Sequence, residues 1–180
     1  MKHHIPSYFK QESERLLMRA LTLKDIAPWK VFFINNSRLK FVAVDDSKPT
    51  EHLAEEWVKR QMQRYEEDGL GMLAVVEKTS SHLIGLCGLL SRDVDGKNEI
   101  EIVYSFMPAY WGKGYATEVA QQMHAFGKAH DLVPHFISMI HTENIASMNV
   151  AKKNGMKPLR QTVYMDMNVI VYSTASATLK

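Results

Sequence analysis

One short glycine-rich stretch carries the residue types and spacing that most directly indicate chemistry in this 180-residue chain. It reads "YWGKGYATE", from Tyr110 to Glu118, and lies between a strand-like segment and a helix-like one. A helix N-terminus presents unpaired N–H groups and partial positive charge, and neighbouring glycines let phosphate oxygens approach those amides. Gly112 and Gly114 would allow that approach, and Lys113 would add a cation. The alternative is a tight turn whose glycines satisfy only local geometry.

Two well-known phosphate-binding loops do not fit this stretch. A P-loop requires Ser or Thr after its Gly-Lys pair, but Lys113 is followed by Gly114. A dinucleotide-binding fingerprint requires a third Gly or Ala at the position of Thr117, and an acid at the end of the next strand. That strand, "HFISMIH", contains no acidic residue.

The order of elements predicts an α+β fold, with one mixed, mostly antiparallel sheet of about seven strands and helices on both faces. Helical spacing follows Thr22, Thr50, Gly114 and Asn144, and Gly155 stops the last helix. No repeat, low-complexity tract or linker divides the chain, so we expect residues 1–180 to form one domain. The expected strands are Arg15–Leu21, Met72–Lys78, His82–Asp93, Asn98–Met107, His135–His141, Lys157–Met165 and Val169–Thr174.

Three motifs together resemble the GNAT acetyltransferase superfamily, and most closely its ribosomal-protein-alanine (Rim-type) branch. "SERLLMRALTLKDI" is similar to the opening strand and helix of that branch, and "EIEIVYSFMPAYWGKGYATE" to its central strand and acyl-CoA loop. "NIASMNVAKKNGMKPL" resembles its late Asn-x-x-Ser helix. The first position of the loop departs from the family, which has Gln or Arg where this chain has Trp111.

The resemblance implies a fold, a co-substrate and a set of binding residues. The implied fold is the GNAT fold, and the implied acyl donor is acetyl-CoA. A backbone amide near Phe106 would polarise the thioester carbonyl, and Asn144 would bond the pantetheine arm, although the same side chain is also expected to cap its helix. Main-chain amides of the loop would hold the pyrophosphate, namely those of Trp111, Gly112, Lys113, Gly114, Tyr115, Ala116 and Thr117.

Two residues are implied as catalytic. Glu101 matches the strand glutamate of the family and would deprotonate the amine through water; the alternative is a strand carboxylate that simply faces solvent. Glu99, which is nearer the turn, is expected to face solvent. Ser147 matches the serine near the CoA sulfur and would protonate or hydrogen-bond the leaving thiolate; the alternative is an exposed helix serine. Many family members carry a tyrosine acid where this chain has Ala151, and an apolar residue where it has His141, to which the sequence assigns no role.

The bulk composition sets wider limits on function. Lys plus Arg number 22 and Asp plus Glu 20, and the net charge of +2 gives no reason to expect nucleic-acid binding. The single cysteine, Cys87, lies in an apolar segment and is expected to be buried, and no apolar run is long enough to span a membrane. We therefore expect a cytoplasmic protein without a metal site, acting as a monomer or homodimer.

Taken together, the sequence predicts an N-acetyltransferase in which an amine attacks acetyl-CoA directly. The acceptor stays open among a protein N-terminus, a polyamine, an amino acid and an antibiotic. We expect the first two helices, residues 35–50 and the last hairpin to select it. The main alternative is a non-catalytic acyl-CoA-binding sensor of the same fold, and a nucleotide-binding domain is a third.

Overall fold

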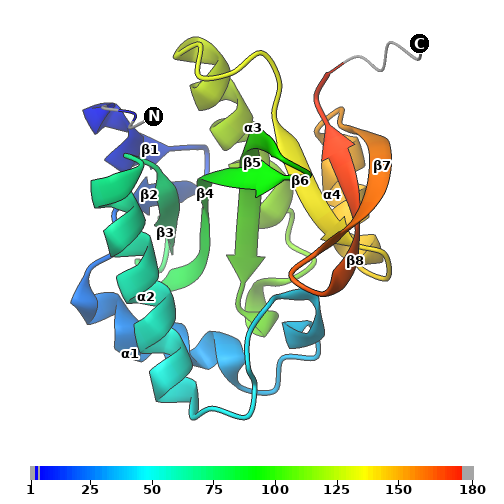
Figure 1. Ribbon diagram of the computed structural model, residues 1–180. Helices are drawn as coiled ribbons and strands as arrows, with labels where there is room; N and C mark the ends of the chain where they lie inside the picture. Colours follow the sequence, from blue (N-terminus) through cyan, green and yellow to red (C-terminus); the bar gives the residue numbers. More distant parts are fainter. Residues whose placement is uncertain (1–2, 4, 176–180) are drawn as a thin grey trace.

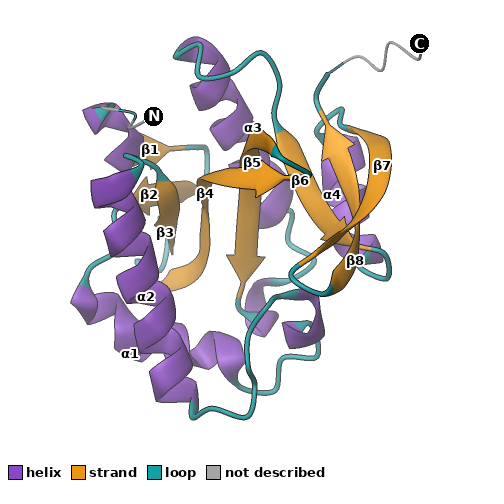
Figure 2. Ribbon diagram, viewed as in Figure 1, coloured by secondary structure: helices purple, strands orange, loops and turns teal. Residues whose placement is uncertain are grey.

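The computed structural model describes residue 3 and residues 5–175, which form one eight-stranded sheet with helices on both faces (Figures 1 and 2). The ends of the predicted domain, residues 1–2 and 176–180, and His4 lie outside the described residues. The strands are β1 (Lys10–Glu12), β2 (Leu16–Arg19), β3 (Gly71–Glu77), β4 (Leu83–Val94), β5 (Lys97–Phe106), β6 (Ile137–His141), β7 (Lys157–Tyr164) and β8 (Met167–Ser173).

The sheet is mixed and mostly antiparallel, as predicted, in the order β1-β2-β3-β4-β5-β6-β8-β7. Short turns connect β3, β4 and β5 into a meander. Asp95 and Gly96 both have positive φ between β4 and β5, which is the backbone of a type I′ hairpin turn. β5 and β6 run parallel, because the chain returns through a helix between them.

The helices divide between the two faces of the sheet. α1 (Ile26–Trp29) and α2 (Thr50–Glu67) cover one face, while α3 (Tyr115–Ala129) and α4 (Ile145–Lys153) cover the other. Alternate residues of β5 reach both layers, since Ile102 packs in the cluster that contains α3 and Val103 in the cluster that contains α2. Within the described part of the chain, no helix combines the length and apolar character needed to cross a membrane.

The structure differs from the expected elements at three places. The sheet gains β1, a three-residue polar strand at one edge that is too short to show an alternating pattern. The predicted helix after Thr22 is broken into 3-10 turns around the four-residue α1. Glu99 was expected in solvent on β5 but is buried, because its carboxylate pairs with His135 Nε2 at 3.0 Å.

Candidate active site

β5 and β6 pair at Glu101 and Ile137 and then diverge toward their carboxyl ends (Figure 1). Side chains bridge the two strands where the main chains begin to separate. The Ser138 hydroxyl donates to the Ile102 carbonyl at 2.8 Å, and the Met139 amide donates to a Glu101 carboxylate oxygen at 3.1 Å. The opening between the two strands is therefore anchored at its base by two side-chain hydrogen bonds.

The end of β5 presents a main-chain amide to this opening. The Met107 amide donates to the Ile84 carbonyl of β4 at 3.0 Å, and Phe106 stands opposite Gly85. Residues of an antiparallel ladder alternate between hydrogen-bonded and non-hydrogen-bonded positions, so the Phe106 amide points away from β4. Pro108, which has no N–H, follows β5 and begins a 3-10 turn, and Met107 keeps its hydrogen bond to β4. The Phe106 amide is thus directed into the gap where the thioester carbonyl was predicted.

The glycine loop leads directly into α3 with unpaired amides. Gly112 has a φ of +75° and Gly114, the N-cap of α3, a φ of +84°, and both values favour glycine. Within the described residues, the amides of Gly112 and of residues 114–117 donate to no other group. A Cβ at Gly112 would meet no atom within 4 Å, so the space beside this amide is open. The loop therefore has the geometry of an anion site at a helix N-terminus.

Trp111, one member of the predicted loop set, contributes differently from expectation. The Trp111 amide donates to the Pro108 carbonyl at 3.2 Å, so it is not available to a ligand. The Trp111 indole instead donates to the Phe106 carbonyl at 2.7 Å and ties the loop to β5. The Lys113 ammonium lies 4.8 Å from the centre of the Tyr110 ring, outside the lining of the cavity beside the loop.

Arg38 is a cation at the loop that sequence reasoning missed. Its guanidinium lies 3.9 Å from the centre of the Trp111 ring and lines the same cavity as Gly112 and Gly114. Stacking on an indole holds a guanidinium in place while its N–H groups stay available. Trp111 at the unusual first position of the loop was the signal for such a partner, but the sequence could not say which arginine reaches it.

An ion pair fastens the loop helix to the edge of the sheet. Glu118, in the first turn of α3, accepts from Arg15 Nε at 2.7 Å and from the Ser13 hydroxyl at 2.6 Å. Arg15 also donates to the Lys113 carbonyl at 2.9 Å. Burial raises the pKa of Glu118, but the hydrogen bonds from Ser13 and Arg15 outweigh it and leave that pKa below its usual value. These contacts of Arg15 and Glu118 hold the loop in its conformation and lie outside the loop cavity.

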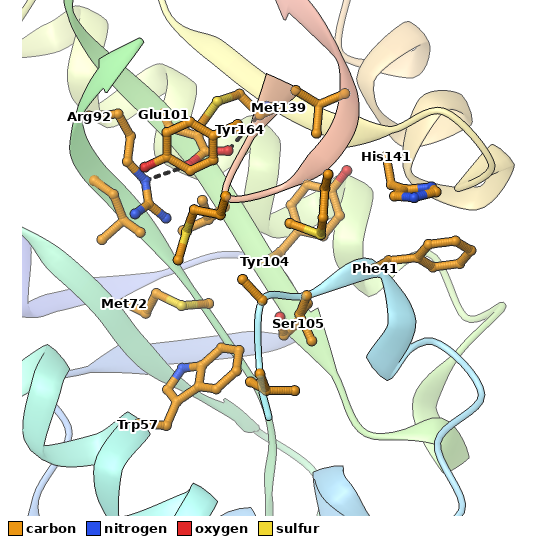
Figure 3. A pocket seen from close by; sticks show the side chains of 18 of the residues that line it. Phe41, Trp57, Met72, Arg92, Glu101, Tyr104, Ser105, Met139, His141 and Tyr164 are labelled. Atoms are coloured by element: carbon orange, nitrogen blue, oxygen red, sulfur yellow. Dashed lines mark hydrogen bonds and ion pairs between the residues drawn. The ribbon is translucent and has the colours of Figure 1, made fainter. Parts of the chain in front are cut away.

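Two cavities meet between the diverging strands. The loop cavity, about 280 Å³, runs from the glycine loop along α4, and the central cavity, about 600 Å³, lies between α2 and the β7–β8 hairpin (Figure 3). Of the segments expected to select an acceptor, α2, the 35–50 loop and the β7–β8 hairpin line the central cavity, whereas α1 does not. The residues that line both cavities are Phe41, Val42, Tyr104, Ser105, Asn144 and Ser147.

Glu101 lines the central cavity but is held by the protein on both of its oxygens. It is 5% exposed, accepts from Arg92 Nε at 2.8 Å through one oxygen, and binds the Met139 amide through the other (Figure 3). Burial lowers the pKa of Arg92, and the Glu101 carboxylate more than reverses this, so the arginine stays charged. A carboxylate has about four lone-pair sites, which leaves room for a further donor at Glu101.

The first turn of α4 brings polar groups to the junction of the cavities. The Asn144 side chain accepts from the Ser147 amide at 3.2 Å, which confirms the predicted N-cap. The Tyr104 hydroxyl donates to the Ser147 carbonyl at 3.3 Å, and burial raises the pKa of Tyr104 to about 12. Ala151 is buried in α4. Tyr104 was visible in the strand pattern that singled out Glu101, but its contact with α4 depends on tertiary packing.

His141 lies at the end of β6, where the central cavity opens. Its ring centre is 5.1 Å from that of Phe41, and its Nδ1 accepts from the Glu143 amide at 3.1 Å (Figure 3). A neutral imidazole with Nδ1 as acceptor carries its hydrogen on Nε2. Within the described residues, no three His, Cys, Asp or Glu side chains gather as a metal site would require.

Comparisons with known proteins agree with this architecture. Among solved structures, an acetyltransferase from Agrobacterium tumefaciens str. C58 has a TM-score of 0.75 at 21% identity and covers 98% of both chains. RimL, a ribosomal L7/L12 α-N-protein acetyltransferase in complex with coenzyme A, has a TM-score of 0.75 at 14% identity, covering 89% of this chain and 94% of its own. At these identities the likenesses show the fold.

The sequence comparisons extend this to the family. The uncharacterised N-acetyltransferase YnaD of Bacillus subtilis (strain 168) is 28% identical over 145 residues, which cover 81% of this chain and 81% of that protein. Residues 15–157, most of the chain, match the model of the acetyltransferase (GNAT) domain. This protein therefore belongs to the GNAT family of acetyltransferases.

Proposed function

We propose that this protein transfers an acetyl group from acetyl-CoA to a primary amine by direct attack within a ternary complex. The observation that carries the proposal is the meeting of two cavities at Tyr104, Ser105, Asn144 and Ser147. Direct transfer requires the donor thioester and the acceptor amine to lie in contact, each approaching from its own side. A loop cavity for the donor and a central cavity for the acceptor meet that requirement.

The loop cavity is proposed to hold CoA. Unpaired amides at Gly112 and at residues 114–117 would bind the pyrophosphate, with Arg38 as an additional cation. The RimL structure named above is a complex with coenzyme A, which supports acetyl-CoA as the donor for this protein. Asn144 would bond the pantetheine arm through the amide nitrogen, because its oxygen already caps α4.

The chemical step needs a polarised carbonyl, a base and a stabilised thiolate. The Phe106 amide would donate to the developing oxyanion, and the Ser147 hydroxyl would donate to the leaving sulfur. Tyr104, whose pKa of about 12 keeps it protonated at neutral pH, is a second O–H group at the same turn of α4. Glu101 lies four residue steps along β5 from the junction at Ser105 and would accept the proton of the ammonium through a chain of water molecules in the central cavity, using lone pairs not occupied by Arg92 or Met139.

The bonds and protons of the proposed reaction balance without a further reactant. The amine nitrogen forms a bond to the acetyl carbon, the carbon–sulfur bond breaks, and CoA leaves as thiolate or thiol. The ammonium gives one proton to the base before it attacks, and the nitrogen loses a second proton after the carbon–nitrogen bond forms, which goes to the leaving sulfur to give the thiol or to solvent if CoA leaves as thiolate. The products are an N-acetyl compound and free CoA, so the appearance of free thiol measures turnover.

A CoA-release assay with an amine panel tests the proposal against its alternatives. If the protein is an acetyltransferase, acetyl-CoA binds and free thiol appears with at least one amine. Glu101→Gln is then expected to lower kcat by roughly 100-fold or more. Binding of acetyl-CoA without release for any amine would favour the sensor. Stronger thermal stabilisation by ATP or NAD than by acetyl-CoA would favour a nucleotide-binding domain. Gel filtration with and without acetyl-CoA decides between a monomer and a homodimer, which the sequence left open.

A further inference from the structure

Arginines gather at the end of the central cavity that lies away from α4. Arg60 and Arg64 line it from α2, and Arg92 lines it from β4. Arg92 has its partner in Glu101 at 2.8 Å. In the described part of the chain, neither Arg60 nor Arg64 forms an ion pair or donates a side-chain hydrogen bond. Both side chains therefore line the cavity without a protein acceptor, with Arg60 exposed at the surface and Arg64 half-buried.

The acids that line this cavity are already engaged. Glu56 pairs with Lys48 at 3.1 Å, and the Asp45 carboxylate accepts from the Ser47 hydroxyl at 2.6 Å. Glu101 is bound to Arg92, as described above. Because Ser47 is neutral, Asp45 keeps its charge. The charged residues that line the cavity are four cations (Lys48, Arg60, Arg64 and Arg92) and three anions (Asp45, Glu56 and Glu101), so one positive charge is left over, and the two α2 arginines have donors free to bind an anion.

Arg64 is the more informative of the two arginines because it is partly buried. Burial is the main cause that lowers its pKa, and repulsion from Arg92 and Arg60 lowers it further. Asp68, one turn along the chain, attracts Arg64 but forms no ion pair with it among the described residues. Arginine does not lose its proton in proteins, so a bound anion would relieve the repulsion and the partial loss of hydration that Arg64 experiences here.

We propose that the acceptor amine carries an anionic group, a carboxylate or a phosphate, which Arg64 and Arg60 bind at the end of the central cavity opposite Ser147. The proposal rests on the transfer reaction proposed above and narrows its acceptor. A volume of about 600 Å³ is that of a small-molecule site, so the acceptor is a small molecule or a short peptide.

The length of β5 sets the spacing between the two groups of the acceptor. Glu101 lies beside Arg92, and Ser105 lies at the junction with the loop cavity. Glu101 and Ser105 are four residue steps apart, which is roughly 13 Å along a strand. The amine and the anion of a bound acceptor are therefore separated by on the order of 10 Å, the length of about three extended residues.

Matched acceptors test this inference by binding and by turnover separately. Triglycine and aminooctanoate carry a carboxylate at this distance, aminooctyl phosphate carries a phosphate, and triglycine amide and octylamine are neutral counterparts. Titration calorimetry in the presence of CoA measures binding of each, and thiol release from acetyl-CoA measures transfer. Comparison of the carboxylate and phosphate arms identifies which anion the site prefers.

Wild type is expected to bind the anionic member of each pair at least about tenfold more tightly than the neutral one, the scale of a hydrogen bond to a charged group. Arg64→Gln is expected to remove that preference. Lys59→Gln is the matched control, because it removes a cation from the same helix at a 59% exposed side chain paired with Glu55. It should leave the preference intact.

The outcomes separate this inference from the proposed reaction. Equal binding of anionic and neutral partners in wild type, a preference that survives Arg64→Gln, or no binding of any of the acids overturns the anion site. An anion preference without thiol release supports the site and counts against the transfer reaction. Thiol release that is equally fast with octylamine and aminooctanoate supports the reaction and overturns the site.

Discussion

The open space beside Gly112 gives a direct test of the glycine loop, because the chain contains a matched control. Gly112 and Gly96 both have a φ of +75°, and a Cβ built on either would meet no atom within 4 Å. Gly96 lies in the β4–β5 turn at the other end of β5, roughly 30 Å along the strand from the loop. Alanine at either position therefore adds the same methyl group in the same backbone region.

The two variants are expected to lose similar stability but different affinity. Placing a side chain in the left-handed region costs about 1–2 kcal/mol, which for a chain of this size lowers Tm by about 2–8 °C. At Gly112 the new methyl group also occupies the space from which a phosphate would reach the loop amides. Loss of one such charge-assisted hydrogen bond weakens binding by about 10- to 100-fold.

Differential scanning calorimetry and acetyl-CoA titration measure both quantities on the same samples. We expect similar Tm values for Gly112→Ala and Gly96→Ala, and weaker acetyl-CoA binding only for Gly112→Ala. Titration with desulfo-CoA, which keeps the pyrophosphate, should show the same difference. If the two variants bind acetyl-CoA equally well, the loop amides do not hold the diphosphate and the assignment of the loop cavity to the donor is wrong.

Three further expectations follow from individual contacts. Asn144→Ala removes the cap of α4 and is expected to cost about 1 kcal/mol in chemical denaturation, whereas Asn144→Asp keeps the cap and isolates any loss of acetyl-CoA affinity to the missing amide N–H₂. Glu118 has a lowered folded pKa, so its contribution to stability is complete above its unfolded pKa and is lost as pH falls through the folded value. Melting temperatures of wild type and Glu118→Gln should therefore differ at pH 7 and converge below about pH 4; a constant difference down to pH 3 would show that the contacts with Arg15 and Ser13 do not depend on the charge. Cys87 is fully buried with a raised thiol pKa, and Ellman's reagent is expected to label it only at the rate of unfolding; rapid labelling of the native protein would contradict this packing.

The sequence predicted the elements whose signals are local. Apolar segments bounded by turn residues predicted β3, β4 and β5, and Asn144 before the last helix predicted the cap of α4. The positive φ of Gly112 and Gly114 was implied by their residue type at a strand-to-helix junction. Each of these features is determined by residues close together in the chain, so a single sequence is enough to indicate it.

The sequence could not predict contacts that depend on distant segments. Glu99 was expected to face solvent because its partner, His135, lies beyond α3 in the sequence, and nothing near Glu99 indicates the ion pair. Arg38 stacks on Trp111 from a segment without regular periodicity, where no rule connects the two residues. The Trp111 amide is occupied because Pro108–Tyr110 forms a 3-10 turn, which the family pattern alone did not indicate.

The ion pair between Arg92 and Glu101 lies between these two cases. The family pattern did not indicate it, but the register of the β4–β5 hairpin, which is set locally, could have done so. A two-residue type I′ turn at Asp95 and Gly96 fixes the register of β4 and β5, so that Arg92 stands opposite Glu99 and diagonal to Glu101. Opposite charges at diagonal positions on one face of a ladder are within reach of each other. The hairpin alone therefore places a guanidinium beside the proposed base.

The Arg92 guanidinium also repels Arg64, so the group that orients Glu101 is one of the groups that leave the acceptor end of the cavity positively charged. The proposed proton acceptor and the proposed anion site would for this reason be coupled through one side chain, and substitution of Arg92 should lower turnover and weaken the preference for anionic acceptors together.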